Sequence, residues 1–188
     1  MTALWEGERV RLQALEPGDV EVFTAADADT DGARAGWRVF PPRSSWAAGQ
    51  WIEQATMATN DGDDFRVAIA ALATGDVVGT LNTHSCDGAA GTCSYGIAVF
   101  PWQRRQGYAS DAIVVVLRYL FGERRYQKCT VGVLAFNDAS VALHESLGFQ
   151  VEGRIRRARF VGGQHHDEIM LGLTVEEYAA RWPLTLPT

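Results

Sequence analysis

Cysteine and lysine are scarce in this sequence. The three cysteines, Cys86, Cys93 and Cys129, form no CxxC pair, and an odd number argues against a complete disulfide framework. We therefore expect a reduced, cytoplasmic setting. Lys128 is the only lysine among 17 basic residues, and we interpret this imbalance as a bias of genome composition rather than as a sign of function.

Long apolar segments are also missing. The densest apolar run covers only residues 112–117, far fewer than the roughly 20 residues that a membrane helix requires. Residues 1–9 contain no basic region followed by an apolar stretch, so we expect no signal peptide and no membrane partner. Of the 188 residues, 47% are hydrophobic and 21% are charged. This size and composition predict one globular domain over residues 1–188.

The charge balance is acidic. The chain carries 23 acidic and 17 basic residues, which gives a formal net charge of -6. Nucleic-acid binding depends on the neutralisation of phosphates by Lys and Arg, so this balance disfavours a nucleic-acid partner. It mildly favours cationic partners such as amines.

The first half of the chain predicts a strand, two helices and three further strands. Polar and apolar residues alternate over residues 9–15, which is typical of a half-buried strand. Pro17 can open a helix, and Ser44 can cap a second one. Between them, residues 27–42 are rich in Asp, Gly and Pro and predict a loop. The three strands expected in the following meander cover residues 65–72, 77–83 and 92–100.

The second half alternates helices and strands. Apolar residues recur at helical spacing over residues 110–121, and Gly148 ends a short helix. The other expected elements are a strand at 128–134, a helix at 140–147, a hairpin of 150–160 with 166–173, and a helix at 174–182. This order predicts an α/β (α+β) fold, in which a mixed, mostly antiparallel central sheet is flanked by helices.

The segment Arg104-Arg105-Gln106-Gly107-Tyr108-Ala109 lies between a strand and a helix. The first turn of a helix leaves N–H groups unpaired, and the helix dipole adds partial positive charge, so a pyrophosphate can bind there. Gly107 lets the backbone approach the phosphates, and the two arginines add cationic donors. On these six residues alone, a capped helix start is an equally good interpretation. The segment is neither a Walker loop nor a dinucleotide fingerprint.

A second motif follows later in the chain, where Asn137 and Ser140 precede Leu147-Gly148-Phe149. Together the two segments resemble the GNAT superfamily of acetyltransferases. The family's pyrophosphate motif, Arg/Gln-x-x-Gly-x-Gly/Ala, is matched by Arg104, Gly107 and Ala109. Its later motif, Asn-x-x-Ala/Ser with Leu-Gly-Phe, is matched by the second segment. Residues 7–13 and 152–171 further resemble the RimJ/RimL group.

This resemblance implies a GNAT-like fold and an acyl-CoA donor, most simply acetyl-CoA. In the family the strand before the loop splays from its neighbour, and the pantetheine arm fills the gap like an added strand. Asn137 would bind this arm, although a helix N-cap suits it equally well. Backbone groups of Ile97, Ala98 and Val99 would pair with the arm, and the amides of Arg105, Gln106, Gly107, Tyr108 and Ala109 would hold the pyrophosphate.

The implied chemistry is direct attack of an amine on the thioester carbonyl. The N–H of Val99 is the expected donor to the oxyanion. Many relatives carry a tyrosine seven residues after the motif asparagine, as the acid for the leaving thiolate, whereas this sequence has His144. A histidine can donate a proton near neutral pH. Ser140, which the family places near the sulfur, is the competing acid, and a packing role for His144 is the plain alternative.

The acceptor side of the site is less constrained. His84 at the end of a strand, together with Trp37 and Phe40 in the predicted loop, are candidate acceptor-binding residues, although core packing is the default for a tryptophan. The base could be His84, a member of the group at 165–168, or a water. We expect no metal site, because adjacent residues on a strand point to opposite faces.

Three functions stay open at this point. The first is transfer of an acetyl group from acetyl-CoA to a small-molecule amine or to a protein N-terminal α-amine. The second is a non-catalytic sensor module that binds acyl-CoA, and the third is an enzyme that uses another acyl-CoA such as succinyl-CoA. The resemblance also implies a homodimer or higher homo-oligomer, for which the C-terminal hairpin is a candidate contact.

Overall fold

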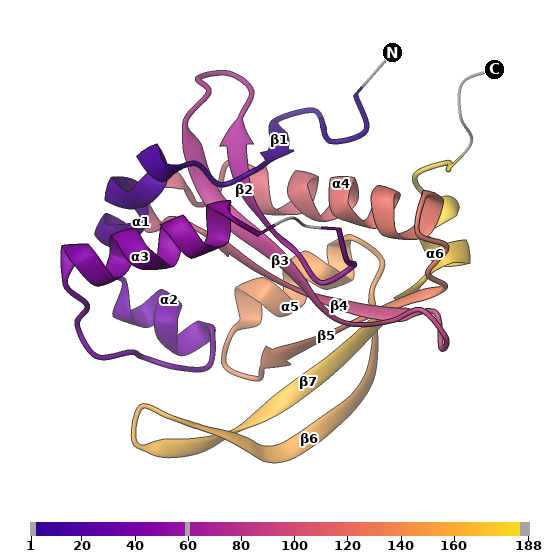
Figure 1. Ribbon diagram of the computed structural model, residues 1–188. Helices are drawn as coiled ribbons and strands as arrows, with labels where there is room; N and C mark the ends of the chain where they lie inside the picture. The colour runs from indigo at the N-terminus through magenta and orange to yellow at the C-terminus, as the bar shows by residue number, and fades with distance from the viewer. Residues whose placement is uncertain (1–2, 59–60, 185–188) are drawn as a thin grey trace.

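A seven-stranded sheet forms the centre of the protein (Figure 1). The computed structural model describes residues 3–58 and 61–184. The strands follow the order β1-β2-β3-β4-β5-β7-β6, and every neighbouring pair is antiparallel except β4 and β5. The strands are β1 (Val10–Gln13), β2 (Arg66–Ala71), β3 (Val77–Asp87), β4 (Thr92–Val99), β5 (Lys128–Leu134), β6 (Gln150–Val161) and β7 (Gln164–Thr174). The mixed, mostly antiparallel sheet expected from the sequence is confirmed.

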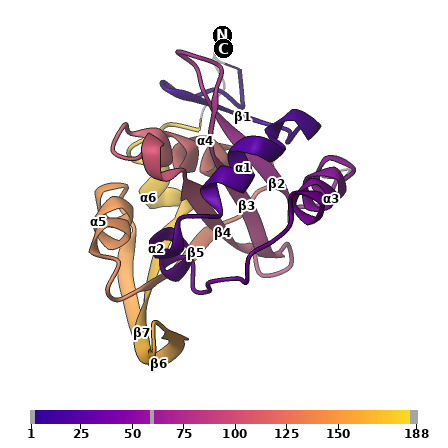
Figure 2. The same cartoon turned by 90° about the vertical axis from the view of Figure 1, so that its left-hand side faces the viewer.

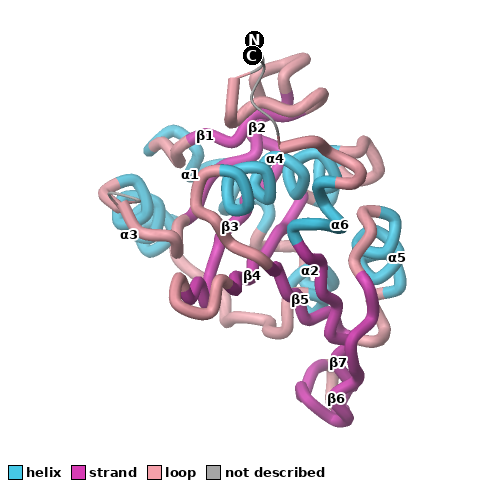
Figure 3. The backbone as a smooth tube through the Cα atoms, turned by 90° about the vertical axis from the view of Figure 1, so that its right-hand side faces the viewer, coloured by secondary structure: helices cyan, strands magenta, loops and turns pink. Residues whose placement is uncertain are grey.

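Helices cover both faces of this sheet. Figure 2 shows α3 on one side of the sheet and α4, α5 and α6 on the other, and Figure 3 shows the same arrangement from the opposite direction. The α-helices of the described residues are α1 (Val20–Ala26), α2 (Thr30–Ala35), α3 (Ser45–Thr56), α4 (Tyr108–Gly122), α5 (Asp138–Ser146) and α6 (Val175–Ala179). Short 3-10 turns, Pro17–Asp19 and Pro101–Gln103, precede α1 and α4.

The main core lies between the sheet and α4. This helix buries seven residues, among them Ile113, Val116 and Leu120, against the odd-numbered residues of β4 and β5. Complete burial of each such side chain stabilises the fold by about 1.5–3 kcal/mol. A smaller cluster on the opposite face joins Phe23 and Ile52 to the sheet. The two cores hold α4 and the α1–α3 pair rigidly on either face, and so fix the loop that enters α4.

The segment between α1 and α3 differs from the loop expected over residues 27–42, because it contains α2. The Asp29 side chain accepts a hydrogen bond of 3.0 Å from the Gly32 N–H, and so caps a helix that Ala33 and Ala35 favour. Six residues are too few for a clear apolar periodicity, which is why the composition indicated a loop. β3 also continues to Asp87, beyond the expected end at residue 83.

Candidate active site

The parallel strands β4 and β5 are paired over only two residues each. Thr92 pairs with Lys128 and Cys93 with Cys129, whereas β4 continues to Val99 and β5 to Leu134. Beyond these pairs the two strands diverge, although β4 stays paired with β3 and β5 with β7. The sheet therefore has an internal gap between the carboxyl-terminal halves of β4 and β5.

The edge of β4 that borders this gap offers backbone groups that pair with no neighbouring strand. On the other edge, the Phe100 N–H donates to the Val78 carbonyl at 2.9 Å. Since hydrogen bonds in an antiparallel ladder alternate along the strand, the backbone groups of Ala98 face β3, whereas those of Ile97 and Val99 face the gap. Two of the three backbone positions expected from the sequence therefore lie on the gap side.

The loop that follows β4 is shaped to receive an anion. Arg105 has a φ of 64° and Gly107 a φ of 79°, and Gly107 is the N-cap residue of α4. No side chain caps this helix, so the N–H groups of its first turn remain open at the positive end of the helix dipole. Residues 104–107 are exposed. An anion can therefore reach these amides from solvent.

Arg9 is a further cation at this loop, and sequence reasoning missed it. A Cβ built on Gly107 would lie 3.2 Å from both Cδ and Nε of Arg9, so the Arg9 side chain lies directly against the glycine. Its Nη1 is 3.5 Å from the Gln106 carbonyl oxygen. Arg9 stands 98 positions before Gly107, and no local pattern in the sequence could connect the two.

Asp111 holds Arg9 in this position. Its carboxylate accepts hydrogen bonds from the backbone N–H groups of Glu8, Arg9 and Val10, at 3.1, 2.7 and 2.9 Å respectively. These bonds bind the start of β1 to the first turn of α4.

Arg104 has a structural partner as well as a place in the loop. It forms an ion pair with Asp29, the N-cap residue of α2, and its Nε donates to the Val99 carbonyl at 3.3 Å. Arg104 therefore connects α2 to the end of β4. The positive charge expected from it near the pyrophosphate is shared with Asp29.

Asn137 and Ser140 lie at the start of α5, after β5. The Asn137 side-chain oxygen accepts a hydrogen bond of 3.2 Å from the Ser140 N–H, which confirms the N-cap that the sequence offered as one of its two interpretations. The Asn137 amide nitrogen has no hydrogen bond to the described residues, and it remains able to donate to a ligand.

His144 lies one turn further along α5 and is 3% exposed. Its Nδ1 is 2.7 Å from the Ser140 carbonyl oxygen, and a carbonyl can only accept, so Nδ1 carries the proton. Burial lowers the pKa of His144 below its ordinary value, and the bond to Ser140 opposes this shift only in part. His144 is therefore neutral near pH 7, with a lone pair on Nε2.

Two buried polar atoms lie together on the helix side of the gap. The ring of His144 stacks on that of Tyr95, with 5.9 Å between the centroids and 25° between the planes. Tyr95 is the second residue of β4 after the last pair with β5. The Tyr95 hydroxyl and His144 Nε2 are both buried without a hydrogen-bond partner among the described residues. Burial also raises the pKa of Tyr95 well above its ordinary value.

The three candidate acceptor residues lie apart from one another. His84 projects from β3 toward Ser94 on β4, with 3.4 Å between Nε2 and Oγ, near the closed end of the gap. Trp37 lies under Arg159 of the β6–β7 hairpin, with the guanidinium carbon 4.3 Å from the ring centroid. Phe40 is 63% exposed, and the Arg38 guanidinium carbon lies 4.8 Å from its ring centroid. Trp37 thus connects the α2 region to the hairpin.

The group at 165–168 divides as expected for a strand. Asp167 accepts hydrogen bonds from Arg157 N–H and Arg154 Nε, which together lower its pKa, and Glu168 lies on the opposite face of β7 near Arg159. In the described parts of the chain, no three His, Cys, Asp or Glu side chains gather into a possible metal site. No helix of the described residues is long and apolar enough to cross a membrane.

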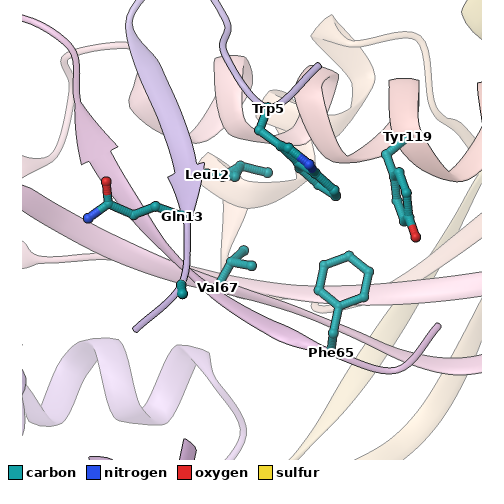
Figure 4. A pocket seen from close by; sticks show the side chains of 7 residues that line it. Trp5, Leu12, Gln13, Phe65, Val67 and Tyr119 are labelled. Carbon is teal, nitrogen blue, oxygen red and sulfur yellow. The ribbon is translucent and has the colours of Figure 1, made fainter. Parts of the chain in front are cut away.

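A separate cavity of about 300 Å³ lies beside β1 and β2, at the β1 edge of the sheet (Figure 4). The rings of Trp5, Phe65 and Tyr119 converge on it, and the Trp5 and Tyr119 centroids are 4.6 Å apart. None of the residues discussed above lines this cavity. The gap beside β4 and the loop after it therefore form a distinct site.

The site thus combines two features. The parallel strands β4 and β5 splay apart, and β4 leads into a helix that begins at Gly107 without a side-chain cap. Residues 9–150 match the family model described as Acetyltransferase (GNAT) domain. This match spans most of the chain and includes β4, the loop and α5. The protein therefore belongs to the GNAT family and is an acetyltransferase.

Named relatives agree with this assignment. The chain is 37% identical over 174 residues to the SPbeta prophage-derived uncharacterized N-acetyltransferase YokL of Bacillus subtilis (strain 168). The aligned residues cover 93% of this chain and 94% of YokL. Among solved structures, the GNAT-family acetyltransferase from Bacillus anthracis superposes with a TM-score of 0.77 at 20% identity, over 91% of this chain and 98% of that one. The spermidine N-acetyltransferase from Vibrio cholerae, solved with CoA and spermine, also superposes with a TM-score of 0.77 at 20% identity, over 90% of this chain and 97% of that one.

Proposed function

We propose that this protein transfers an acetyl group from acetyl-CoA to an amine, by direct attack within a ternary complex. The observation that carries the proposal is the open edge of β4, which ends at a loop with free helix amides. An extended chain with a pyrophosphate at one end fits such an edge and such a loop in succession. The spermidine enzyme, solved with CoA, supports this choice of donor by its shared fold.

The residues present fit the pyrophosphate and the pantetheine arm of acetyl-CoA. The first-turn amides of α4 and the arginine pair Arg9 and Arg105 would hold the pyrophosphate, since Gly107 offers no side chain to obstruct it. Backbone groups of Ile97 and Val99 would pair with the pantetheine arm in place of β5. The free amide nitrogen of Asn137 would donate to the same arm. In this arrangement the thioester lies in the gap.

The chemistry follows from that placement. The amine nitrogen attacks the thioester carbonyl carbon, and the negative charge that develops on oxygen is stabilised by the Val99 N–H, which points into the gap. Removal of one such donor typically costs about 10²–10³-fold in turnover. Because the donor is a backbone group on a packed strand, it needs no reorganisation during the reaction.

His144 is the proposed proton donor to the leaving sulfur. Its resting ring is neutral, with Nδ1–H bound to Ser140 and the lone pair on Nε2. We therefore infer that Nε2 takes up a proton during the reaction and passes it to the thiolate as the C–S bond breaks. Ser140, whose hydroxyl lies 3.5 Å from His144 Nδ1, is the competing donor.

The acceptor belongs to one of two classes. A small-molecule amine is favoured by the acidic surface and by the fold shared with the spermidine enzyme. A protein N-terminal α-amine is favoured by the likeness of residues 7–13 and 152–171 to the RimJ/RimL group. A homodimer through the β6–β7 hairpin is a further expectation, since exposed Val151, Ile155 and Phe160 lie on its edge strand.

Release of free thiol tests the function directly. The protein is incubated with acetyl-CoA and, in turn, with spermidine, benzylamine and a tripeptide with a free N-terminus. The proposal predicts amine-dependent thiol release, with one acetylated amine formed for each thiol. Tight acetyl-CoA binding without thiol release would instead favour the non-catalytic sensor. Faster release from succinyl-CoA than from acetyl-CoA would favour the alternative donor.

A further inference from the structure

Two glycines face each other across the gap. Continuation of the parallel register from the pair Cys93 and Cys129 places Gly96 of β4 at the level of Gly132 of β5. Side chains alternate along a strand, so both glycines belong to the face opposite the α4 core. This face is therefore bare of side chains at the level where the two strands separate.

A polar side chain from a neighbouring strand lies over each glycine. A Cβ on Gly96 would be 3.1 Å from Oδ1 of Asn82, and a Cβ on Gly132 would be 2.0 Å from Oε1 of Glu168. Asn82 comes from β3 and Glu168 from β7. The amide and the carboxylate thus flank the gap from its two sides, on the face away from His144.

The carboxylate of Glu168 is buried and weakly paired. The residue is 5% exposed, and the described residues offer its carboxylate one cation, Arg159, whose Nε is 3.4 Å from Oε2. That separation is too long for a good hydrogen bond. A buried carboxylate ordinarily receives several donors, and an ammonium group supplies three.

A β-bulge in the hairpin keeps Arg159 at this position. The pairing of β6 with β7 shifts between Ile155 and Arg159, and Arg157 within the shift has a φ of 53°. Beyond the bulge, Arg159 lies between the ring of Trp37 and the carboxylate of Glu168. Residues of the α2 region and of the hairpin thus meet beside Glu168, and the low exposure of this carboxylate strengthens its attraction for a cation.

We propose that Glu168 binds the acceptor as its ammonium ion and is the base that deprotonates it. This inference rests on the proposed acetyl transfer and adds the class of acceptor, a primary amine that is cationic in solution. One proton passes from the ammonium to Glu168 and on to water. The free amine forms the C–N bond, and the C–S bond breaks with its electron pair on sulfur. The loss of the second proton from nitrogen is balanced by the proton that His144 Nε2 takes up and passes to the thiolate, so the amide and the free CoA thiol are formed with release of one proton.

The variant Glu168→Gln tests this role through its pH profile, measured with whichever of the three acceptors the wild type acetylates best. A variant without the base must capture the small fraction of amine that is already neutral, and that fraction rises tenfold per pH unit below the amine's pKa. We expect kcat/KM at pH 7 to fall about 10²-fold, and the deficit to shrink by about tenfold for each pH unit gained up to the pKa of the amine. Affinity for acetyl-CoA stays unchanged.

Glu152→Gln is the matched control. The Glu152 carboxylate also lies over a glycine, Gly172, and pairs with a cation, Lys128, at 2.6 Å, but it lies outside the gap. We expect this control to keep wild-type kcat/KM at every pH. If Glu168→Gln is fully active, or if its deficit is the same at pH 7 and pH 9, Glu168 is not the base.

Two further results keep the outcomes separate. If Glu168→Gln does not fold, Glu168→Asp replaces it, and a carboxylate drawn back by one methylene should still give a deficit that shrinks with pH. A constant deficit in that variant overturns the inference. If the wild type acetylates no amine at all, the proposed function fails before the role of Glu168 arises.

Discussion

Gly107 is the residue at which the proposed pyrophosphate site is most sensitive to a single change. It adopts a left-handed conformation at the start of α4, with φ 79°. Any side chain there costs about 1–2 kcal/mol of backbone strain and presses on Arg9, whose Nε is 3.2 Å from the new Cβ. Gly107→Glu adds to this a carboxylate at the mouth of the open amides.

The loss of affinity can be worked from Coulomb's law. One charge about 5 Å from another interacts by about 3 kcal/mol at an effective dielectric constant of about 20. Repulsion of this size corresponds to about 100-fold in affinity. Gly107→Ala carries the strain without the charge, so we expect it to lower acetyl-CoA affinity by less than about tenfold.

Calorimetric titration with acetyl-CoA measures both variants. Gly163→Glu is the control, because Gly163 has a similar φ of 84° at the hairpin tip, with nothing within 4 Å of its Cβ position. It should bind acetyl-CoA as the wild type does. Normal binding by Gly107→Glu would show that the pyrophosphate lies elsewhere, and equal losses in Gly107→Glu and Gly107→Ala would show that strain alone is responsible.

Three further changes have definite expected outcomes. His144→Phe should lower kcat on the order of 10²-fold with little change in acetyl-CoA affinity, and unchanged turnover would remove His144 from the mechanism. Burial lowers the pKa of His144 in the folded state, so the imidazole binds a proton more readily in the unfolded chain. The wild type should therefore lose stability as pH falls below about 6.5. Urea unfolding of His144→Phe should lack this pH-dependent loss of stability. Asp111→Ala leaves three N–H groups without their acceptor and should lower the free energy of unfolding by about 2–3 kcal/mol; an unchanged urea midpoint would contradict this role.

Local patterns were enough to predict the sheet, most helices and the family. The apolar alternation of the strands, the glycine in residues 104–109 and the capping asparagine Asn137 each depend on neighbours in the sequence. The motif after β5 decided the interpretation of residues 104–109, which follow β4. It favoured a pyrophosphate site over a plain helix start. The gap beside β4 was implied by the family resemblance rather than by a local pattern, and of the three residues expected there Ala98 faces β3 instead.

The features that sequence reasoning missed depend on contacts between distant segments. Arg9 reaches Gly107 only because Asp111 binds the start of β1. Glu168 comes to lie over Gly132 through the pairing of β7 with β5, and its position in the sequence beside Asp167 gave no preference between the two acids. Helix α2 was missed because six residues with Asp and Gly resemble a loop in composition.

Amide hydrogen exchange of the β4 backbone tests most directly whether this strand binds the pantetheine arm of acetyl-CoA. With acetyl-CoA added, the amides of Ile97 and Val99 should become strongly protected, because the cofactor arm takes the place of a paired strand. The amide of Ala98, which already faces β3, should exchange at the same rate with and without the cofactor. Protection of the loop amides alone, with Ile97 and Val99 unchanged, would contradict the placement of the thioester in the gap.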